Sequence, residues 1–145
     1  MPNAARRTLE RFQNSTPMRP QHSPYKCLAQ TYGAKVQYSP NASTAPALDK
    51  CGITRMQSTD GTFLYISRAV NSTMLVTLNK IGAAQASPTT DTIQKTKMLM
   101  DYTAMQPDAV IRFHASNMCL HININAAYLV QPKAYSRAAG HFYLS

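Results

Sequence analysis

The pattern of apolar and polar residues predicts helices in the first two thirds of the chain and strands in the last third. Residues 3–13 place Ala5, Leu9 and Phe12 at helical spacing on one face. Residues 14–24 contain three prolines, which remove backbone donors and favour extended backbone. An N-terminal helix and an extended basic linker are therefore expected before the middle of the chain.

Three apolar faces predict helices in the middle of the chain. Their residues are, in order, Ile53, Met56, Phe63, Leu64 and Val70; Met74, Leu75, Leu78 and Ile81; and Ile93, Leu99, Met100 and Tyr102. Asn71–Thr73 offers short polar side chains that can cap the second of these helices. Ser87–Asp91 is a start signal for the third, which should run to about Ala104 and end before Pro107.

Alternation of apolar and polar residues predicts strands nearer the C-terminus. The segments are residues 110–115, Met118–Asn125, Ala126–Leu129 and Ala138–Ser145, with a further short strand expected earlier, over Tyr32–Tyr38. Val130–Arg137 is predicted to be a basic loop between the last two. Helices followed by strands indicate an α+β fold that ends in a small antiparallel sheet. The expected domains are residues 1–50, 51–106 and 107–145.

The excess of basic over acidic residues shows that the predicted α+β protein is strongly basic. The chain of 145 residues carries fifteen Lys and Arg against six Asp and Glu, a formal net charge of +9. All six acids precede residue 109, so the predicted C-terminal strands contain no carboxylate side chain. Nucleic acid is the first partner that this charge favours and an anionic membrane surface the second. The alternative is a solvated basic surface without such a partner.

Cysteine usage and hydropathy predict the compartment. The three cysteines are widely spaced and form no Cys-x-x-Cys pair, which is typical of a reducing environment. The N-terminus lacks the apolar run of a signal peptide, and no stretch approaches the ~20 apolar residues of a membrane span. An intracellular protein, cytoplasmic or nuclear and not secreted or inserted in a membrane, is therefore expected.

Several short motifs follow one another in a recognisable order. They are Leu9–Gln13 and Arg19–Pro24, Tyr32–Tyr38, Gly61–Tyr65 with Arg68–Val70, Leu99–Tyr102 with Pro107–Ala109, and Ile124–Leu129 with Ala138–Ser145. This order resembles the Pol polyprotein of copia-type retrotransposons. The resemblance implies a segment that runs from the end of the reverse transcriptase, through thumb-like connecting helices, into the first strands of a ribonuclease H-like domain.

The resemblance also implies that catalysis is lost in this chain. Asn125 stands where the family places its first catalytic aspartate, and the polymerase signature Tyr-x-Asp-Asp is absent. Ribonuclease H chemistry uses two magnesium ions, which rely on carboxylate ligands. We therefore expect no catalytic residues, no bound metal or cofactor and no enzyme activity in this chain. The resemblance implies that Mg²⁺ is the metal ion of the parent family.

Binding to RNA, DNA or their hybrid is the function that these observations leave. The candidate nucleic-acid-binding residues are Arg112, Lys133, Tyr135 and Arg137, which combine phosphate-neutralising charge with a ring that can stack on bases. An alternative is a protein-interaction module, because a truncated sheet leaves open edges through which the chain can self-associate. A weaker alternative is a zinc site formed by His114, Cys119 and His121.

Overall fold

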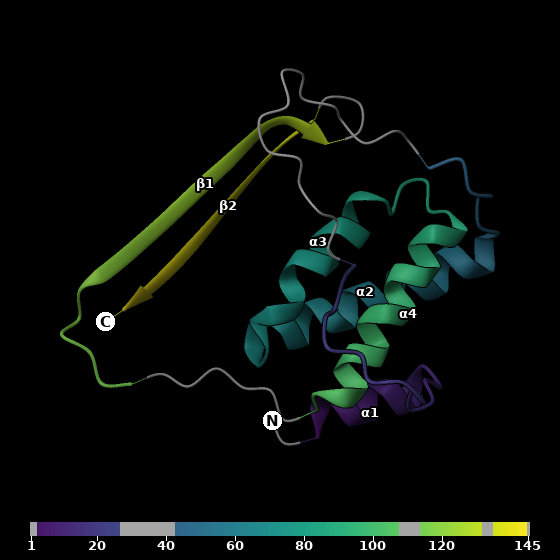
Figure 1. The fold of residues 1–145 in the computed structure, drawn as a ribbon, viewed down its shortest axis with the longest axis horizontal. Helices are drawn as coiled ribbons and strands as arrows, with labels where there is room; N and C mark the ends of the chain where they lie inside the picture. The colour runs from purple at the N-terminus through teal and green to yellow at the C-terminus, as the bar shows by residue number, and fades with distance from the viewer. Residues whose placement is uncertain (1–2, 27–42, 108–113, 132–134, 145) are drawn as a thin grey trace. The chain divides into compact units, whose positions relative to one another are not determined.

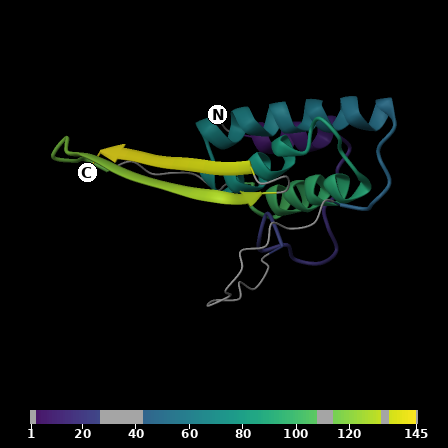
Figure 2. The ribbon, with the colours of Figure 1, turned by 90° about the horizontal axis from the view of Figure 1, so that it is seen from above.

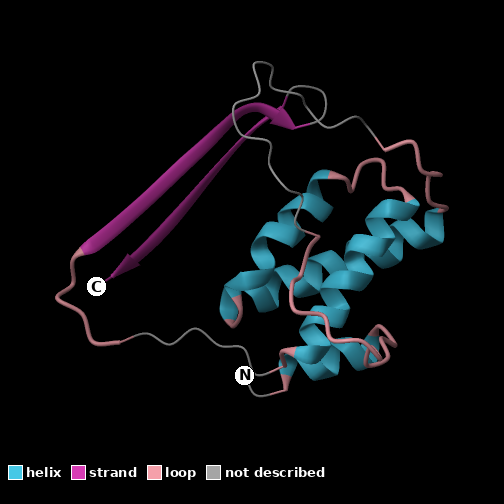
Figure 3. Cartoon of the chain, viewed as in Figure 1, coloured by secondary structure: helices cyan, strands magenta, loops and turns pink. Residues whose placement is uncertain are grey.

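The computed structural model describes residues 3–26, 43–107, 114–131 and 135–144. These residues fall into two compact units, which we treat separately. The helical unit comprises residues 3–26 and 45–107, and the second unit contains a β-hairpin within residues 120–144. Figure 1 labels the elements along the chain and Figure 3 marks them as helix or strand. Helices followed by a two-stranded antiparallel sheet confirm the predicted α+β class.

The first helix belongs to the helical core. Helix α1 spans Ala4–Arg11 and packs against α2 and α4, which are described below. Leu9 and Phe12 are buried, as their spacing predicts. The ring of Phe12 stacks on that of Phe63 with their centroids 6.5 Å apart, and the Phe12 carbonyl accepts a 3.0 Å hydrogen bond from Nη2 of Arg55.

Helix α2 is the longest element of the helical unit and spans Lys50–Ala69. Its N-terminus is capped by Asp49, whose carboxylate accepts a 3.0 Å hydrogen bond from the backbone N–H of Gly52. The helix buries Met56, Phe63 and Ile66, with Phe63 completely enclosed. Met56 and Phe63 belong to the predicted apolar face, whereas Ile66 was not predicted. The other predicted residues, Ile53, Leu64 and Val70, are half-buried, so the prediction located the core-facing side of the helix only in part.

A short turn leads from α2 to the next helix. Asn71 accepts a 3.1 Å hydrogen bond from the backbone N–H of Thr73 and caps the 3₁₀ turn Ser72–Met74. Helix α3 follows over Leu75–Ala83 and buries Leu78 and Ile81. The predicted cap and the predicted apolar face are therefore both confirmed.

Helix α4 spans Thr90–Met105, close to its predicted bounds. Leu99 and Tyr102 are buried, but Ile93 is 42% exposed, so its assignment to the core was wrong. The buried positions of this helix form a stripe of Thr92, Thr96, Leu99 and Thr103. Ile93 lies one residue, or about 100° of helical rotation, away from the stripe. Threonines thus hold core positions that a search for apolar residues overlooks.

The segment between α1 and α2 has no helix in its described part, as its prolines predict. It is nevertheless attached to α3 at two points. Thr77 donates a 3.2 Å hydrogen bond to the carbonyl of Pro24, and the Lys80 ammonium lies 4.6 Å from the centre of the Tyr25 ring. A buried hydroxyl needs such a partner, so this contact fixes the backbone at Pro24 on the helical unit.

The second unit contains one long antiparallel hairpin. Strand β1 spans Leu120–Gln131 and strand β2 spans Tyr135–Leu144. Residues pair in register from Leu120 with Leu144 to Ala127 with Arg137, and an irregularity separates this ladder from the last pair, Gln131 with Tyr135. Figure 2 shows the two strands running side by side along their length.

The hairpin corrects three predicted boundaries. Met118–Asn125 and Ala126–Leu129 were expected as two strands, but β1 runs through both. Most of the predicted loop Val130–Arg137 is strand, because residues 130–131 end β1 and residues 135–137 begin β2. Alanines 126 and 127 do not break the strand, because they themselves pair with Ala138 and Arg137 at the end of the regular ladder.

Two predicted strands cannot be compared in full. Residues 32–38 and 110–113 lie outside the described residues, and residues 114–115, which are described, are not in a strand.

Candidate nucleic-acid interface

The register of the hairpin sorts its residues into two faces of different chemistry. Side chains of directly opposed residues share a face, and successive residues alternate between faces. One face, which we call the polar face, carries His121, Asn123, Asn125, Ala139, His141 and Tyr143. The other, the apolar face, carries Leu120, Ile122, Ile124, Ala126, Ala138, Gly140, Phe142 and Leu144. All of these residues are exposed.

Three rings form a continuous stack on the polar face. The imidazole of His121 lies 5.1 Å from the Tyr143 ring, centroid to centroid, at an interplanar angle of 13°. The His141 ring lies 5.0 Å from the same Tyr143 ring, at an interplanar angle of 30°. Cross-strand pairing places His121 opposite Tyr143, and the alternation of β2 places His141 two residues before it. The result is an aromatic row across both strands, open to solvent.

Amide side chains extend the polar face beyond this row. Asn123 pairs with His141 in the register, and Asn125 pairs with Ala139. Amides carry both a donor and an acceptor, so they can bond base edges or phosphates. Rings on which bases stack, beside groups that bond to their edges, are the components of a single-strand-binding surface.

The sequence-predicted binding residues are only partly placed. Arg112 and Lys133 lie outside the described residues. The backbones of Tyr135 and Arg137 belong to β2, where they pair with Gln131 and Ala127. Sequence reasoning missed the row of His121, Tyr143 and His141. Alternation within each strand was visible in the sequence, but the row depends on which residue of β2 lies opposite His121.

Asn125 is held in β1 and exposed on the polar face. No Asp or Glu occurs after Asp108, so the hairpin offers no carboxylate beside it. A neutral amide oxygen is a poor ligand for magnesium, which relies on carboxylates in such sites.

The structure does not assemble the ligands of the alternative zinc site. Within the described ranges, no group of three or more His, Cys, Asp or Glu side chains is placed to hold a metal ion. His114, Cys119 and His121 are each exposed, and Cys119 is a free thiol.

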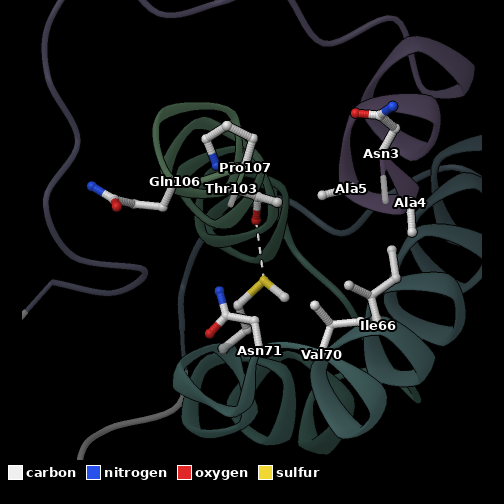
Figure 4. A pocket seen from close by; sticks show the side chains of 10 residues that line it. Asn3, Ala4, Ala5, Ile66, Val70, Asn71, Thr103, Gln106 and Pro107 are labelled. Atoms are coloured by element: carbon white, nitrogen blue, oxygen red, sulfur yellow. Dashed lines mark hydrogen bonds between the residues drawn. The ribbon is translucent and has the colours of Figure 1, made fainter. Parts of the chain in front are cut away.

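The helical unit contains a small cavity among its described residues. It has a volume of about 20 Å³, close to the space that one water molecule needs. Figure 4 shows the side chains around it, which come from the N-terminal end of α1, from the end of α2 and the 3₁₀ turn that follows it, and from the end of α4. The hydroxyl of Thr103 donates to the sulfur of Met74 at 3.1 Å and closes one side. Small-molecule sites are usually at least ten times larger.

One carboxyl group of the helical unit has a perturbed pKa. Burial raises the pKa of Asp60, which is 6% exposed, while a hydrogen bond from the Gln85 amide works in the opposite direction. The other carboxylate oxygen, Oδ1, is buried and has no hydrogen-bond partner among the residues that the structure describes. Perturbed carboxyls often mark active sites. Among the described residues, Asp60 does not belong to a group of three or more His, Cys, Asp or Glu side chains that could hold a metal ion.

Comparisons with models of known families, with curated proteins and with solved structures each find no match to this chain. The resemblance to copia-type polyproteins therefore stays a prediction. No helix in the described ranges combines the length and the hydropathy needed to cross a membrane.

Proposed function

We propose that this chain is a non-catalytic segment of a copia-type Pol polyprotein that binds nucleic acid weakly and without sequence preference. The polar face of the hairpin is the proposed contact surface. The observation that carries the proposal is the exposed row of His121, Tyr143 and His141. Stacking of a base on an aromatic side chain contributes about 1–3 kcal/mol and tolerates any base.

Charge supports the same partner. With a formal net charge of +9, the chain attracts polyanions over distances set by the salt concentration. Basic side chains also outnumber acidic ones in the described helical unit. Electrostatic attraction would bring the nucleic acid to the protein, and the aromatic side chains of the hairpin would then hold its bases by stacking. Unpaired strands suit this face better than a duplex, whose bases are already stacked.

The proposal is tested by a binding titration in which two neighbouring aromatic residues are compared. Tyr143→Ala removes the central ring of the row, whereas Phe142→Ala removes a ring from the opposite face of the same strand. At protein concentrations too low for self-association, Tyr143→Ala should weaken binding to a labelled single-stranded oligonucleotide about 5- to 100-fold. Phe142→Ala should change affinity less than about twofold.

Salt dependence is the second part of the test. Affinity should fall as salt rises, with a slope of about −0.7 in log–log units for each phosphate contacted on a single strand. Affinity that ignores salt, or an equal loss in both variants, would contradict the proposal. An RNA–DNA hybrid with Mg²⁺ should not be cleaved, even by Asn125→Asp, because one carboxylate does not hold two metal ions.

A second candidate function rests on the open edge of strand β1. In the described part of the second unit, strand β1 pairs only with β2, so β1 has one edge of open backbone donors and acceptors. Strand β1 contains no charged residue and no proline, the features that commonly prevent such an edge from pairing. We propose, as the alternative, that a partner protein adds a strand to this edge. Binding that is insensitive to Tyr143→Ala and to salt would favour it.

A further inference from the structure

The apolar face of the hairpin is the largest exposed apolar feature in the described part of the second unit. Its five large side chains, Leu120, Ile122, Ile124, Phe142 and Leu144, are between 50% and 71% exposed. They lie on one side of a regular ladder, so they form a continuous surface. Soluble proteins seldom leave a contiguous surface of this kind uncovered unless another molecule binds it.

We propose that this face binds the same face of a second copy, so that two hairpins form a four-stranded sandwich. The proposal is independent of nucleic-acid binding, because the residues involved lie on the opposite side of the strands. A dimer of this kind leaves both polar faces directed outward.

Net charge opposes contact between two copies everywhere except on an uncharged surface. Two copies of a chain with net charge +9 repel each other, so they can meet closely only where neither carries charge. The apolar face meets this condition, because none of its eight residues is charged. The absence of charge along the face also removes the ion pairs that would select a different, acidic partner.

The shape of the face also suits self-association. Large side chains are concentrated at the end where Leu120 pairs with Leu144, and small ones where Ala126 pairs with Ala138. Between them, the Phe142 ring lies over Gly140, where an added Cβ would come within 2.7 Å of the ring. If a two-fold axis perpendicular to the strands relates the two copies, the strands of one copy run opposite to those of the other. The large end of one copy then lies over the small end of the other, which keeps the two sheets evenly about 10 Å apart.

The area is sufficient for a reversible dimer. Five side chains that each lose about 100 Å² of exposed surface remove about 500 Å² per copy, or about 1,000 Å² in total. This total is below the ~1,200–2,000 Å² of stable specific interfaces and is typical of weak, transient complexes, so we expect dissociation constants in the micromolar range or weaker. Pairing through the open edge of β1 would give a different product, because it would leave the apolar faces of both copies uncovered.

The test compares two lysine substitutions at adjacent positions of the full-length chain by sedimentation equilibrium. Ile124→Lys places a charge on the apolar face, and Asn125→Lys adds the same charge to the polar face. Wild type and Asn125→Lys should form dimers with dissociation constants within about threefold of each other, and Ile124→Lys should weaken the dimer at least about 30-fold. Both positions are exposed, so the helical unit should melt at the same temperature in all three proteins.

Salt separates this association from nucleic-acid binding. Dimerisation should strengthen as salt screens the repulsion between copies, whereas binding to an oligonucleotide should weaken. A wild-type chain that stays monomeric up to about 1 mM would overturn the proposal, as would equal weakening by both lysines. Association that survives Ile124→Lys would also overturn it, in favour of pairing through the open edge of β1.

Discussion

The large apolar side chains are buried in the core of the helical unit but exposed in the hairpin. In the helical unit, Phe63, Ile81 and Leu99 are completely buried against neighbouring helices. In the hairpin, the large apolar residues Ile122, Ile124 and Phe142 are more than half exposed, although backbone pairing is regular. An isolated two-stranded hairpin is marginally stable in water, because it has no second layer against which to bury its face. The helical unit can thus be stable by its own packing, whereas the hairpin gains stability from whatever covers it.

The largest expected effect comes from truncating one phenylalanine in each region. Phe63→Ala leaves a cavity in the helical core and should lower the free energy of unfolding by about 3–5 kcal/mol. Phe142→Ala removes a side chain that is 61% exposed and should change it by less than about 0.5 kcal/mol at concentrations below association. Urea titrations followed by far-ultraviolet circular dichroism measure both. Equal losses would show that the hairpin is part of the same cooperative core.

A smaller effect concerns the buried carboxylate of the helical unit. Gln85→Ala removes the hydrogen-bond donor that the structure places against Asp60. A buried acceptor left without a partner costs about 1–3 kcal/mol, so this variant should lose stability by that amount at neutral pH. The loss should shrink in acid, where Asp60 takes up a proton. A loss that does not change with pH would assign the role of Gln85 to packing alone.

The pH dependence of the wild type has a definite sign. Because burial raises the pKa of Asp60 in the folded protein, its contribution to stability is fully present below the unfolded value of about 3.9. That contribution is lost as the pH rises through the raised folded pKa. Asp60→Asn keeps the shape but cannot ionise, so the stability difference between variant and wild type should vary over this window. A constant difference would contradict the raised pKa.

The smallest expected effect is a gain within α2. Gly61 is exposed in the middle of this helix, and a Cβ added there would meet no atom within 4 Å. Gly61→Ala should therefore stabilise the helical unit by about 1 kcal/mol, because alanine loses less backbone entropy on folding. Gly52→Ala is the matched control in the same helix. Its Cβ would lie 2.8 Å from the Asp49 oxygen that caps the helix, so the gain should be cancelled or reversed.

The helices were largely predictable from the sequence, and the reason is local. Leu9, Phe63, Leu78 and Leu99 each lie at helical spacing from other apolar residues of their own helix. The capping residues Asn71 and Thr89 lie next to the segments that they cap, so each signal is contained in one short segment. Ile93 was misplaced because threonines occupy much of the buried stripe of α4. Apolar residues alone therefore do not locate that face.

The candidate interface was less predictable because it depends on pairing between distant residues. Alternation showed that His121 and Asn123 share a side of β1, but not that Tyr143 lies opposite His121. The basic residues Arg112 and Lys133, which were predicted from charge alone, lie outside the described residues. Register is determined by the whole ladder and its turn, which no local pattern encodes. Family membership stays a prediction based on the order of the motifs.

Hydrogen exchange of the backbone amides, measured at about 1 µM and about 100 µM protein, compares the two units in one experiment. Amides of α2 and α4 should be equally protected at both concentrations, because their core lies within one copy. Amides of residues 120–126 and 138–144 should exchange rapidly at the lower concentration and gain at least about tenfold protection at the higher one, as two copies cover each other's apolar face. Hairpin amides as protected as those of α2 at the lower concentration would contradict the distinction between a self-sufficient helical unit and a hairpin stabilised by association.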